Sequence, residues 1–142
     1  MGARRSGREA ALQMLFQLEA TGQSPDQVIE LFWRSFEDAD PEGRSYADTI
    51  VRGVSDTTTA IDERITSAST NWRLERMSRV DRNLLRLGTW ELMSRADVPR
   101  AVVLDEAVEL AKSFGTDESS AFVNGVLDRI ANDLGRKDEA RG

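Results

Sequence analysis

Two residue types that carry much of protein chemistry are missing from this chain of 142 residues, which has no cysteine and no histidine. Without cysteine it cannot form disulfides, thiolate metal sites or a cysteine nucleophile, and without histidine it cannot form imidazole metal sites or a histidine-based triad. The classes that remain are an enzyme using carboxylates, serine or lysine, and a protein that works by binding. The length is that of one compact domain with its own core.

Long apolar stretches are also missing. The longest apolar runs have three or four residues, and no apolar segment follows Met1. A membrane-spanning helix needs about 20 mainly apolar residues, and a signal peptide needs an apolar segment of about 7 to 15 residues. The sequence therefore predicts neither, and cytoplasm is the default expectation for localisation.

Positive charge comes almost entirely from arginine. The chain has 19 basic and 25 acidic residues, a net charge of −6, and its only lysines are Lys112 and Lys137. The planar guanidinium group suits two-point contacts with phosphate, although coding bias in a GC-rich genome would give the same composition. The net charge argues against a chain that is basic throughout and leaves room for a local basic site.

The charges are grouped along the chain. Residues 24–63 hold ten acids and three bases, whereas residues 64–86 hold six arginines and two acids. The first eight residues carry three arginines and no acid, and residues 87–142 have a net charge of −4. Two cationic stretches separated by an acidic one indicate either surfaces for two different partners or ordinary solvated helix faces.

Helical spacing dominates the sequence. Apolar residues recur at intervals of three and four, and no segment keeps a period of two for long, so an all-α fold with about seven helices is predicted. Ser24, Pro25 and Gln27 have the pattern of a capping box with proline in the first helical position. The first predicted helix covers residues 6–20, and the second begins at Ser24. A third begins near Pro41 and continues over 61–68 after a bend at 56–59, and a short helix or turn begins at Trp72. Three more helices are predicted, capped by Ser78, by Asp105 and by Thr116 or Asp117.

A short connector at 67–71 is expected to separate an N-terminal helical half, about residues 4–68, from a C-terminal half, about residues 71–134. Residues 135–142 are charged and are expected to fray. Gly115 is expected to take a left-handed conformation at a helix end. Gly125 is expected to mark a close contact between helices.

Paired carboxylates are the first candidate site. Asp105, Glu106 and Glu109 are three or four residues apart and can share one helix face, as a carboxylate metal site or an acid–base pair requires. The same spacing is that of solvated helix surface. Neither a P-loop nor a dinucleotide-binding motif occurs in the sequence, so nucleotide-driven chemistry is disfavoured.

The arginine cluster at the N-terminus is the second candidate. Arg4, Arg5 and Arg8 flank the predicted start of a helix, where free N–H groups and the helix dipole favour anions. Residues three or four apart can face the same way, which is a workable geometry for holding a phosphate backbone. The alternative is a disordered cationic terminus.

Several longer stretches are specific enough to indicate a family. They are residues 4–16 (RRSGREAALQMLF), 80–86 (VDRNLLR), 90–92 (WEL), 98–103 (VPRAVV), 105–115 (DEAVELAKSFG) and 122–127 (FVNGVL). In this order, and over about residues 4–130, they resemble the NusB family of transcription antitermination factors. Gly7 stands where that family usually has alanine and Phe16 where tyrosine is common, and glycine lowers helix propensity by about 1 kcal/mol, so a looser first turn is predicted.

The resemblance implies an all-α fold of two small bundles packed across each other, a single NusB-like domain over residues 1–142, and no catalytic activity; we expect no metal or cofactor. It implies pairing with NusE, a basic ribosomal protein of the small subunit, and joint binding to the boxA element of nascent RNA. The transcription elongation complex would then read through terminators, notably in ribosomal RNA operons. By family position, the RNA-binding residues would be Arg4, Arg5, Arg8, Glu118 and Phe122, and the partner-binding residues would be Glu75 and Asp81.

Phe114 and Phe122 are the aromatic candidates for stacking on RNA bases, but both occupy apolar helix positions, which favours a place in the core. The resemblance also allows a homodimer, since some family members self-associate over their basic surface, and the sequence predicts no dimer patch. Two other functions stay open. One is the NusB-like module of an rRNA-modifying enzyme, but the sequence has neither the cysteine nor the Gly-rich nucleotide-binding turn that such an enzyme needs. The other is a helical adaptor without RNA contact.

Overall fold

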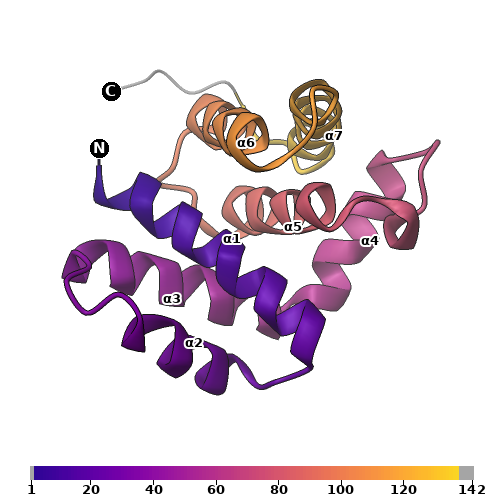
Figure 1. Cartoon of the computed structure of the whole chain (residues 1–142). Coiled ribbons are helices and arrows are strands. Elements are labelled where there is room, and N and C mark those ends of the chain that lie inside the picture. The colour runs from indigo at the N-terminus through magenta and orange to yellow at the C-terminus, as the bar shows by residue number, and fades with distance from the viewer. Residues whose placement is uncertain (1, 138–142) are drawn as a thin grey trace. The chain divides into compact units, whose positions relative to one another are not determined.

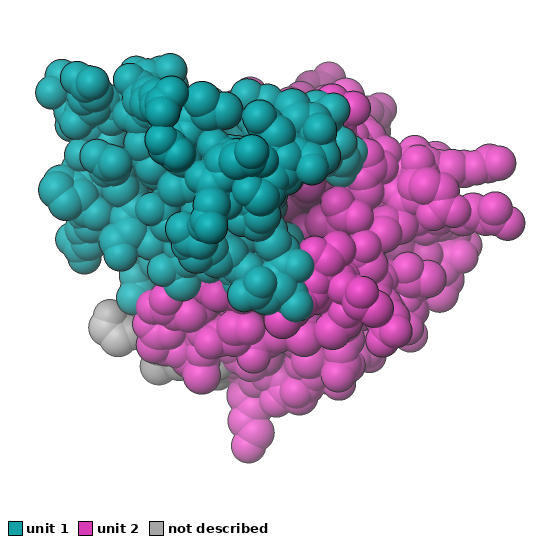
Figure 2. Space-filling model, turned by 90° about the horizontal axis from the view of Figure 1, so that it is seen from below, with its two compact units in different colours: residues 1–56 teal, residues 57–142 magenta. Residues whose placement is uncertain are grey.

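The computed structural model describes residues 2–137, which form seven α-helices and one short 3-10 helix and include no β-strand (Figure 1). The elements are α1 (Ala3–Thr21), α2 (Pro25–Arg34), α3 (Pro41–Asp56), α4 (Thr58–Ala68), η1 (Leu74–Arg76), α5 (Arg79–Ser94), α6 (Arg100–Phe114) and α7 (Ser119–Asp133). The all-α prediction is confirmed. The chain divides into two compact units, Met1–Asp56 and Thr57–Gly142, which are coloured separately in Figure 2.

The first unit consists of α1, α2 and α3, with α1 lying against α3. Leu12 of α1 and Ile50 and Val51 of α3 are fully buried. Gly7 is buried where the two helices approach, and a Cβ atom there would stand 2.9 Å from the carbonyl oxygen of Gly43 on α3. The looser first turn predicted from Gly7 is not observed, because α1 is helical through this position and the glycine is packed against α3.

The start of α2 follows from its sequence. Ser24 Oγ accepts a hydrogen bond from the backbone N–H of Gln27 at 3.2 Å, and the Gln27 side chain accepts one from the backbone N–H of Ser24 at 3.0 Å. The predicted capping box is confirmed. At the other end of the helix, the Trp33 indole N–H donates to Asp48 Oδ1 at 2.7 Å, which ties α2 to α3.

The second unit is built around α5, which lies against α4, α6 and α7. Ile61 and Ile65 of α4 and Leu127 of α7 are fully buried. A Cβ atom on Gly88 of α5 would stand 2.7 Å from Leu127 Cδ1, whereas a Cβ atom on Gly125 would meet nothing within 4 Å. The close helix contact that the sequence placed at Gly125 is therefore made by Gly88, and Gly125 lies on an exposed face.

The two units meet in the chain between Asp56 and Thr57, one helix earlier than the connector expected at 67–71. Thr57 has φ −123° and ψ 22°, outside the helical range, and so separates α3 from α4. Ile61 and Ile65 are buried on α4, whose neighbours are α5 and α7. Helix α4 therefore belongs with the C-terminal helices, and the connector at 67–71 lies within the second unit.

Two helix starts in the second unit differ from the prediction. Helix α6 begins at Arg100 after Pro99, so Asp105 lies inside the helix and is not its N-cap. Proline fits there because the first N–H groups of a helix have no partner within it. Helix α7 has Glu118 as N-cap, not Thr116 or Asp117. Gly115 is extended, with φ −105° and ψ −164°, and not left-handed.

The chain beyond α7 is held in place through Arg136. Its Nη1 donates to the carbonyl oxygen of Leu92 at 2.8 Å, its Nη2 donates to that of Val98 at 2.6 Å, and its own carbonyl accepts from Arg100 Nη1 at 2.8 Å. The fraying expected from residue 135 is therefore not observed at Arg136. Residues 138–142 of that expected tail lie outside the described residues.

Candidate nucleic-acid interface

The N-terminal arginines do not share one environment. Arg4 and Arg5 are exposed in the first turn of α1, whereas Arg8, one turn later, is only 3% exposed. The guanidinium carbons of Arg4 and Arg8 lie 5.2 and 5.5 Å from the ring centre of Tyr46 on α3, which is cation–π distance. Arg4 and Arg5 thus occupy the surface at which a phosphate contact was predicted, and the structure does not bring Arg8 to that surface.

The start of α1 has the electrostatics of an anion-binding end. Gly2 is the N-cap and supplies no side-chain hydrogen bond, and the first turn contains no acidic residue. The positive end of the helix dipole is therefore not neutralised by a capping carboxylate. Together with the two exposed guanidinium groups of Arg4 and Arg5, it favours a negatively charged ligand.

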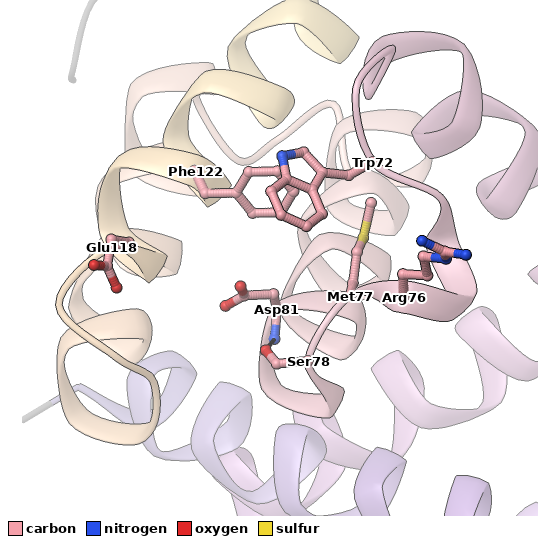
Figure 3. Close-up of a pocket in the computed structure, with 7 residues that line it drawn as sticks. All are labelled: Trp72, Arg76, Met77, Ser78, Asp81, Glu118 and Phe122. Atoms are coloured by element: carbon pink, nitrogen blue, oxygen red, sulfur yellow. Dashed lines mark hydrogen bonds between the residues drawn. The ribbon is translucent and has the colours of Figure 1, made fainter.

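Three of the other four predicted residues meet in a pocket of the second unit (Figure 3). Its volume is about 410 Å³. It brings together Asp81, which was predicted for partner binding, and Glu118 and Phe122, which were predicted for RNA binding. The lining residues are Trp72, Arg76, Met77, Ser78, Asp81, Glu118 and Phe122.

Three chain segments position these side chains. Asp81 lies in the first turn of α5, where Ser78 caps the helix by accepting the Asp81 N–H at 3.1 Å. Phe122 lies in the first turn of α7. Its ring meets the Trp72 indole edge to face, with ring centres 6.4 Å apart and planes 77° apart. The predicted cap at Ser78 is confirmed, and it fixes the position of the Asp81 backbone.

The pocket combines carboxylates with aromatic walls. Asp81 Oδ1 is buried and has no hydrogen-bond partner among the described residues. Glu118 is exposed and accepts a hydrogen bond from Thr116 Oγ1 at 3.3 Å. Because a buried carboxylate oxygen without a partner is costly, the pocket is suited to a ligand that brings a cation or an N–H donor to Asp81.

Glu75 is exposed on η1 and does not line this pocket. Trp72, Arg76 and Met77 line it and were not predicted as site residues. The excess of arginine over residues 64–86 and the tryptophan in the connector were the available signals for them. An aromatic ring in an exposed connector cannot join the core through helical spacing, so it has to be judged as a surface residue.

Neither aromatic candidate for base stacking belongs to the core. Phe114 is 36% exposed at the end of α6. Phe122 is half-buried against Trp72 at the pocket. The expectation that both rings fill the core, drawn from their apolar helix positions, is therefore wrong. Each lies in a terminal turn of its helix, Phe114 at the end of α6 and Phe122 at the start of α7.

Of the three candidate carboxylates on α6, Glu106 is half-buried and the other two lie at the surface. Asp105 and Glu109 are exposed. Lys112 Nζ forms an ion pair with Glu109 Oε1 at 3.4 Å. Among residues 2–137 there is no cluster of three or more acidic side chains that could hold a metal ion. No helix in the same part of the chain is long and apolar enough to cross a membrane.

Comparison with known proteins gives the family. The family model for NusB matches residues 5–132. The chain belongs to the NusB family. A member from Sorangium cellulosum, named transcription antitermination protein NusB, is 67% identical over 141 residues that cover 99% of this chain and 100% of the relative. The NusB of Myxococcus xanthus is 52% identical and covers 92% of this chain and 96% of its own length.

Solved structures of NusB proteins have the same fold. The structure of T. maritima NusB matches with a TM-score of 0.84 and 41% identity, covering 91% of this chain and 90% of its own. A crystal structure of antitermination factors NusB and NusE in complex with dsRNA contains a chain that matches with a TM-score of 0.85 and 26% identity. That match covers 94% of this chain and 98% of the other.

Proposed function

We propose that this chain is a transcription antitermination factor that binds boxA RNA jointly with the ribosomal protein NusE. On that RNA it would promote read-through by the elongation complex, notably in ribosomal RNA operons. The observation that carries the proposal is the NusB family match over residues 5–132. A chain of the same fold, 26% identical, belongs to a structure of NusB and NusE with dsRNA, which supports both partners.

The partner-binding residues in this proposal are Asp81 and Glu75. The buried Oδ1 of Asp81 lacks a hydrogen-bond partner among the described residues, so a lysine or arginine of a basic protein would meet an acceptor that is already desolvated. Glu75 is exposed on η1 and would add attraction at the edge of the contact. A close charge pair of this kind contributes most when it is withdrawn from water.

The RNA-binding residues in this proposal belong to two places. Arg4 and Arg5 would contact phosphates at the start of α1, where the buried Arg8 shares the Tyr46 ring with Arg4. Glu118 and Phe122 would lie along the RNA at the start of α7, with the half-exposed ring of Phe122 available for a base. Unpaired bases bind proteins by stacking and by hydrogen bonds at their edges.

The proposal assigns no catalytic residue, cofactor or metal. It places the protein in the cytoplasm, where nascent RNA and ribosomal proteins meet. The curated relatives are named for a regulatory role in transcription, which supports a function through binding.

The proposal is tested by measuring the binding of labelled boxA RNA and a scrambled RNA of equal length to the chain, with and without NusE. We expect tighter binding of boxA RNA when NusE is present. Replacing Arg4 and Arg5 by alanine should weaken RNA binding and reduce the slope of log K against log salt by about 0.7 per lost phosphate contact.

Asp81→Lys separates the two surfaces. It should weaken NusE binding more than it weakens RNA binding by the isolated chain. Glu63→Lys is the matched control, because it makes the same charge change at an exposed position of α4 that lines no predicted site. Equal loss in both assays for Asp81→Lys would contradict separate surfaces, and no preference for boxA RNA in any mixture would leave only the adaptor function.

A further inference from the structure

The six arginines over residues 64–86 are not used by the proposed function. Three of them are held within the fold or pair with acids. Arg86 makes two hydrogen bonds to Asp62 at 2.9 and 3.1 Å, and Arg82 donates to the backbone carbonyls of Leu74 and Met77. Arg79 also has an interaction within the structure. Arg64, Arg73 and Arg76 are exposed and have no side-chain partner among the described residues.

Two of these three arginines line a second cavity. It has a volume of about 290 Å³ and is lined by Asn71, Trp72, Arg73 and Arg76. The 3-10 turn explains why both reach it, since side chains at i and i+3 of such a turn lie above one another. The turn is closed by the Arg76 N–H, which donates to the Arg73 carbonyl at 3.0 Å. Glu75, between them in sequence, does not line the cavity.

Trp72 presents an unusually open aromatic surface. The residue is 57% exposed, the largest exposed fraction among the large apolar residues described. The backbone beneath it is fixed, because its carbonyl accepts a hydrogen bond from Ser69 Oγ at 3.2 Å. Phe122 supports the indole edge to face. An exposed aromatic ring is the kind of surface on which proteins stack nucleobases.

The two cavities share Trp72 and Arg76 but differ in charge. The first contains the carboxylates of Asp81 and Glu118, and the second contains two guanidinium groups and one amide. Figure 3 shows the Arg76 guanidinium directed away from Asp81. A basic protein side chain is therefore favoured in the first cavity, and an anionic ligand is favoured in the second.

We infer that the cavity of Asn71, Trp72, Arg73 and Arg76 binds one nucleotide of single-stranded RNA. The base stacks on the Trp72 indole, Arg73 and Arg76 contact the adjoining phosphates, and the Asn71 amide faces the edge of the base. The inference rests on the proposed function, because it supposes that the chain binds RNA, and it adds a contact point to that RNA. An acidic peptide would satisfy the arginines but would leave the open indole without a stacking partner.

The test uses the full chain, a labelled single-stranded boxA RNA and fluorescence anisotropy. Trp72→Ala should weaken binding about tenfold, and Trp72→Phe should restore most of the loss because a smaller aromatic face remains. Arg73→Ala and Arg76→Ala should each lower the slope of log K against log salt by about 0.7. Arg64→Ala is the matched control, an exposed arginine without a partner on α4 that lines neither cavity, and it should leave the slope unchanged.

Three results of the single-strand measurements would overturn the inference. Equal effects of Arg64→Ala and Arg73→Ala would show that only the overall charge matters. Poly-glutamate that competes as well as RNA of equal charge would assign the cavity to an acidic protein. If the Trp72→Ala variant binds RNA normally while the Arg4 and Arg5 variants do not, the cavity is not an RNA-binding site. The proposed function would not be affected by that result. Failure of the unmodified chain to bind RNA would instead contradict the proposed function itself.

A duplex of the same sequence gives a further check on stacking. Its bases are already stacked on one another, so Trp72→Ala should not weaken duplex binding. An equal loss with both RNA forms would contradict base stacking. NusE binding in the absence of RNA should be unchanged by Arg73→Ala, and a loss there would assign the cavity to the protein partner.

Discussion

Gly7 and Gly125 both lie within α-helices and both lack a side chain, but their surroundings are opposite. A Cβ atom on Gly7 would stand 2.9 Å from a backbone oxygen of Gly43, whereas a Cβ atom on Gly125 would meet nothing within 4 Å. Backbone atoms cannot move aside as the end of a flexible side chain can. At Gly7 the absence of a side chain therefore serves helix packing, and at Gly125 no contact in the structure requires it.

Alanine substitutions at these two glycines should change stability in opposite directions. Helix propensity alone would stabilise each variant by up to about 1 kcal/mol. At Gly7 the added methyl group overpacks the contact between α1 and α3, which typically costs about 1–3 kcal/mol, so Gly7→Ala should be destabilising. Gly125→Ala should be stabilising. Urea unfolding at constant m-value measures both, and a stabilised Gly7→Ala would contradict the close contact.

At the scale of elements, the turn between α5 and α6 depends on a residue from beyond α7. Arg136 donates to the carbonyl oxygens of Leu92, near the end of α5, and Val98, before α6. The last carbonyls of a helix have no partner within it, and here a distant guanidinium satisfies one of them. Arg100, the first residue of α6, completes the arrangement by binding both the Arg136 carbonyl and Asp128.

Removing the Arg136 side chain should loosen this turn. Two carbonyl oxygens would lose a charged donor, and a hydrogen bond of that kind contributes about 1.5–3 kcal/mol, so Arg136→Ala should lower the free energy of unfolding by about that amount. Lys137→Ala is the control, because Lys137 is the exposed neighbour. Urea unfolding gives the comparison, and equal stability of the two variants would show that the Arg136 bonds are replaced by water without loss.

Local signals in the sequence predicted the elements better than their partners. The caps at Ser24 and Ser78 could be predicted because each bond lies within three residues of the cap. The start of α6 could not be predicted in this way. Asp105 is a residue type that often caps helices, whereas the turn at Val98 and Pro99 is held by Arg136, which lies far away in the sequence. The assignment of α4 to the second unit likewise depends on contacts with α5 and α7.

The candidate site shows the same limit. Three of the residues that the resemblance indicated, Asp81, Glu118 and Phe122, line one pocket. The resemblance could not indicate that Arg8 is buried, because that depends on Tyr46 of another helix. It also passed over Trp72, whose exposure is set by a turn that Ser69 closes.

At the scale of the whole molecule, a net charge of −6 opposes association with RNA. The arginines are concentrated at the start of α1 and over residues 64–86. RNA phosphates are therefore attracted at these two places and repelled by the net negative charge of the rest of the chain. At about 0.1 M salt, exposed charges farther apart than about 10 Å are largely screened, so local contacts outweigh the general repulsion. A basic partner would offset the general repulsion as well as add contacts.

The salt dependence of RNA binding should therefore differ between the chain alone and the chain with NusE. With NusE, the slope of log K against log salt should be steeper, by about 0.7 for each phosphate that the partner adds. Titration at four or more salt concentrations measures it. Identical slopes would contradict a cationic contribution from the partner and would indicate that NusE acts only by ordering this chain.

The division of the chain between Asp56 and Thr57 has a consequence for synthesis. The first unit consists of consecutive residues, and every contact among α1, α2 and α3 is available once residue 56 has left the ribosome. At a synthesis rate of about 5–20 residues per second, the rest of the chain takes roughly 4–17 s, whereas helical proteins with local contacts fold in microseconds to milliseconds. The helix that carries Arg4 and Arg5 can therefore form its packing before Glu118 and Phe122, the last residues of the aromatic pocket, have been translated.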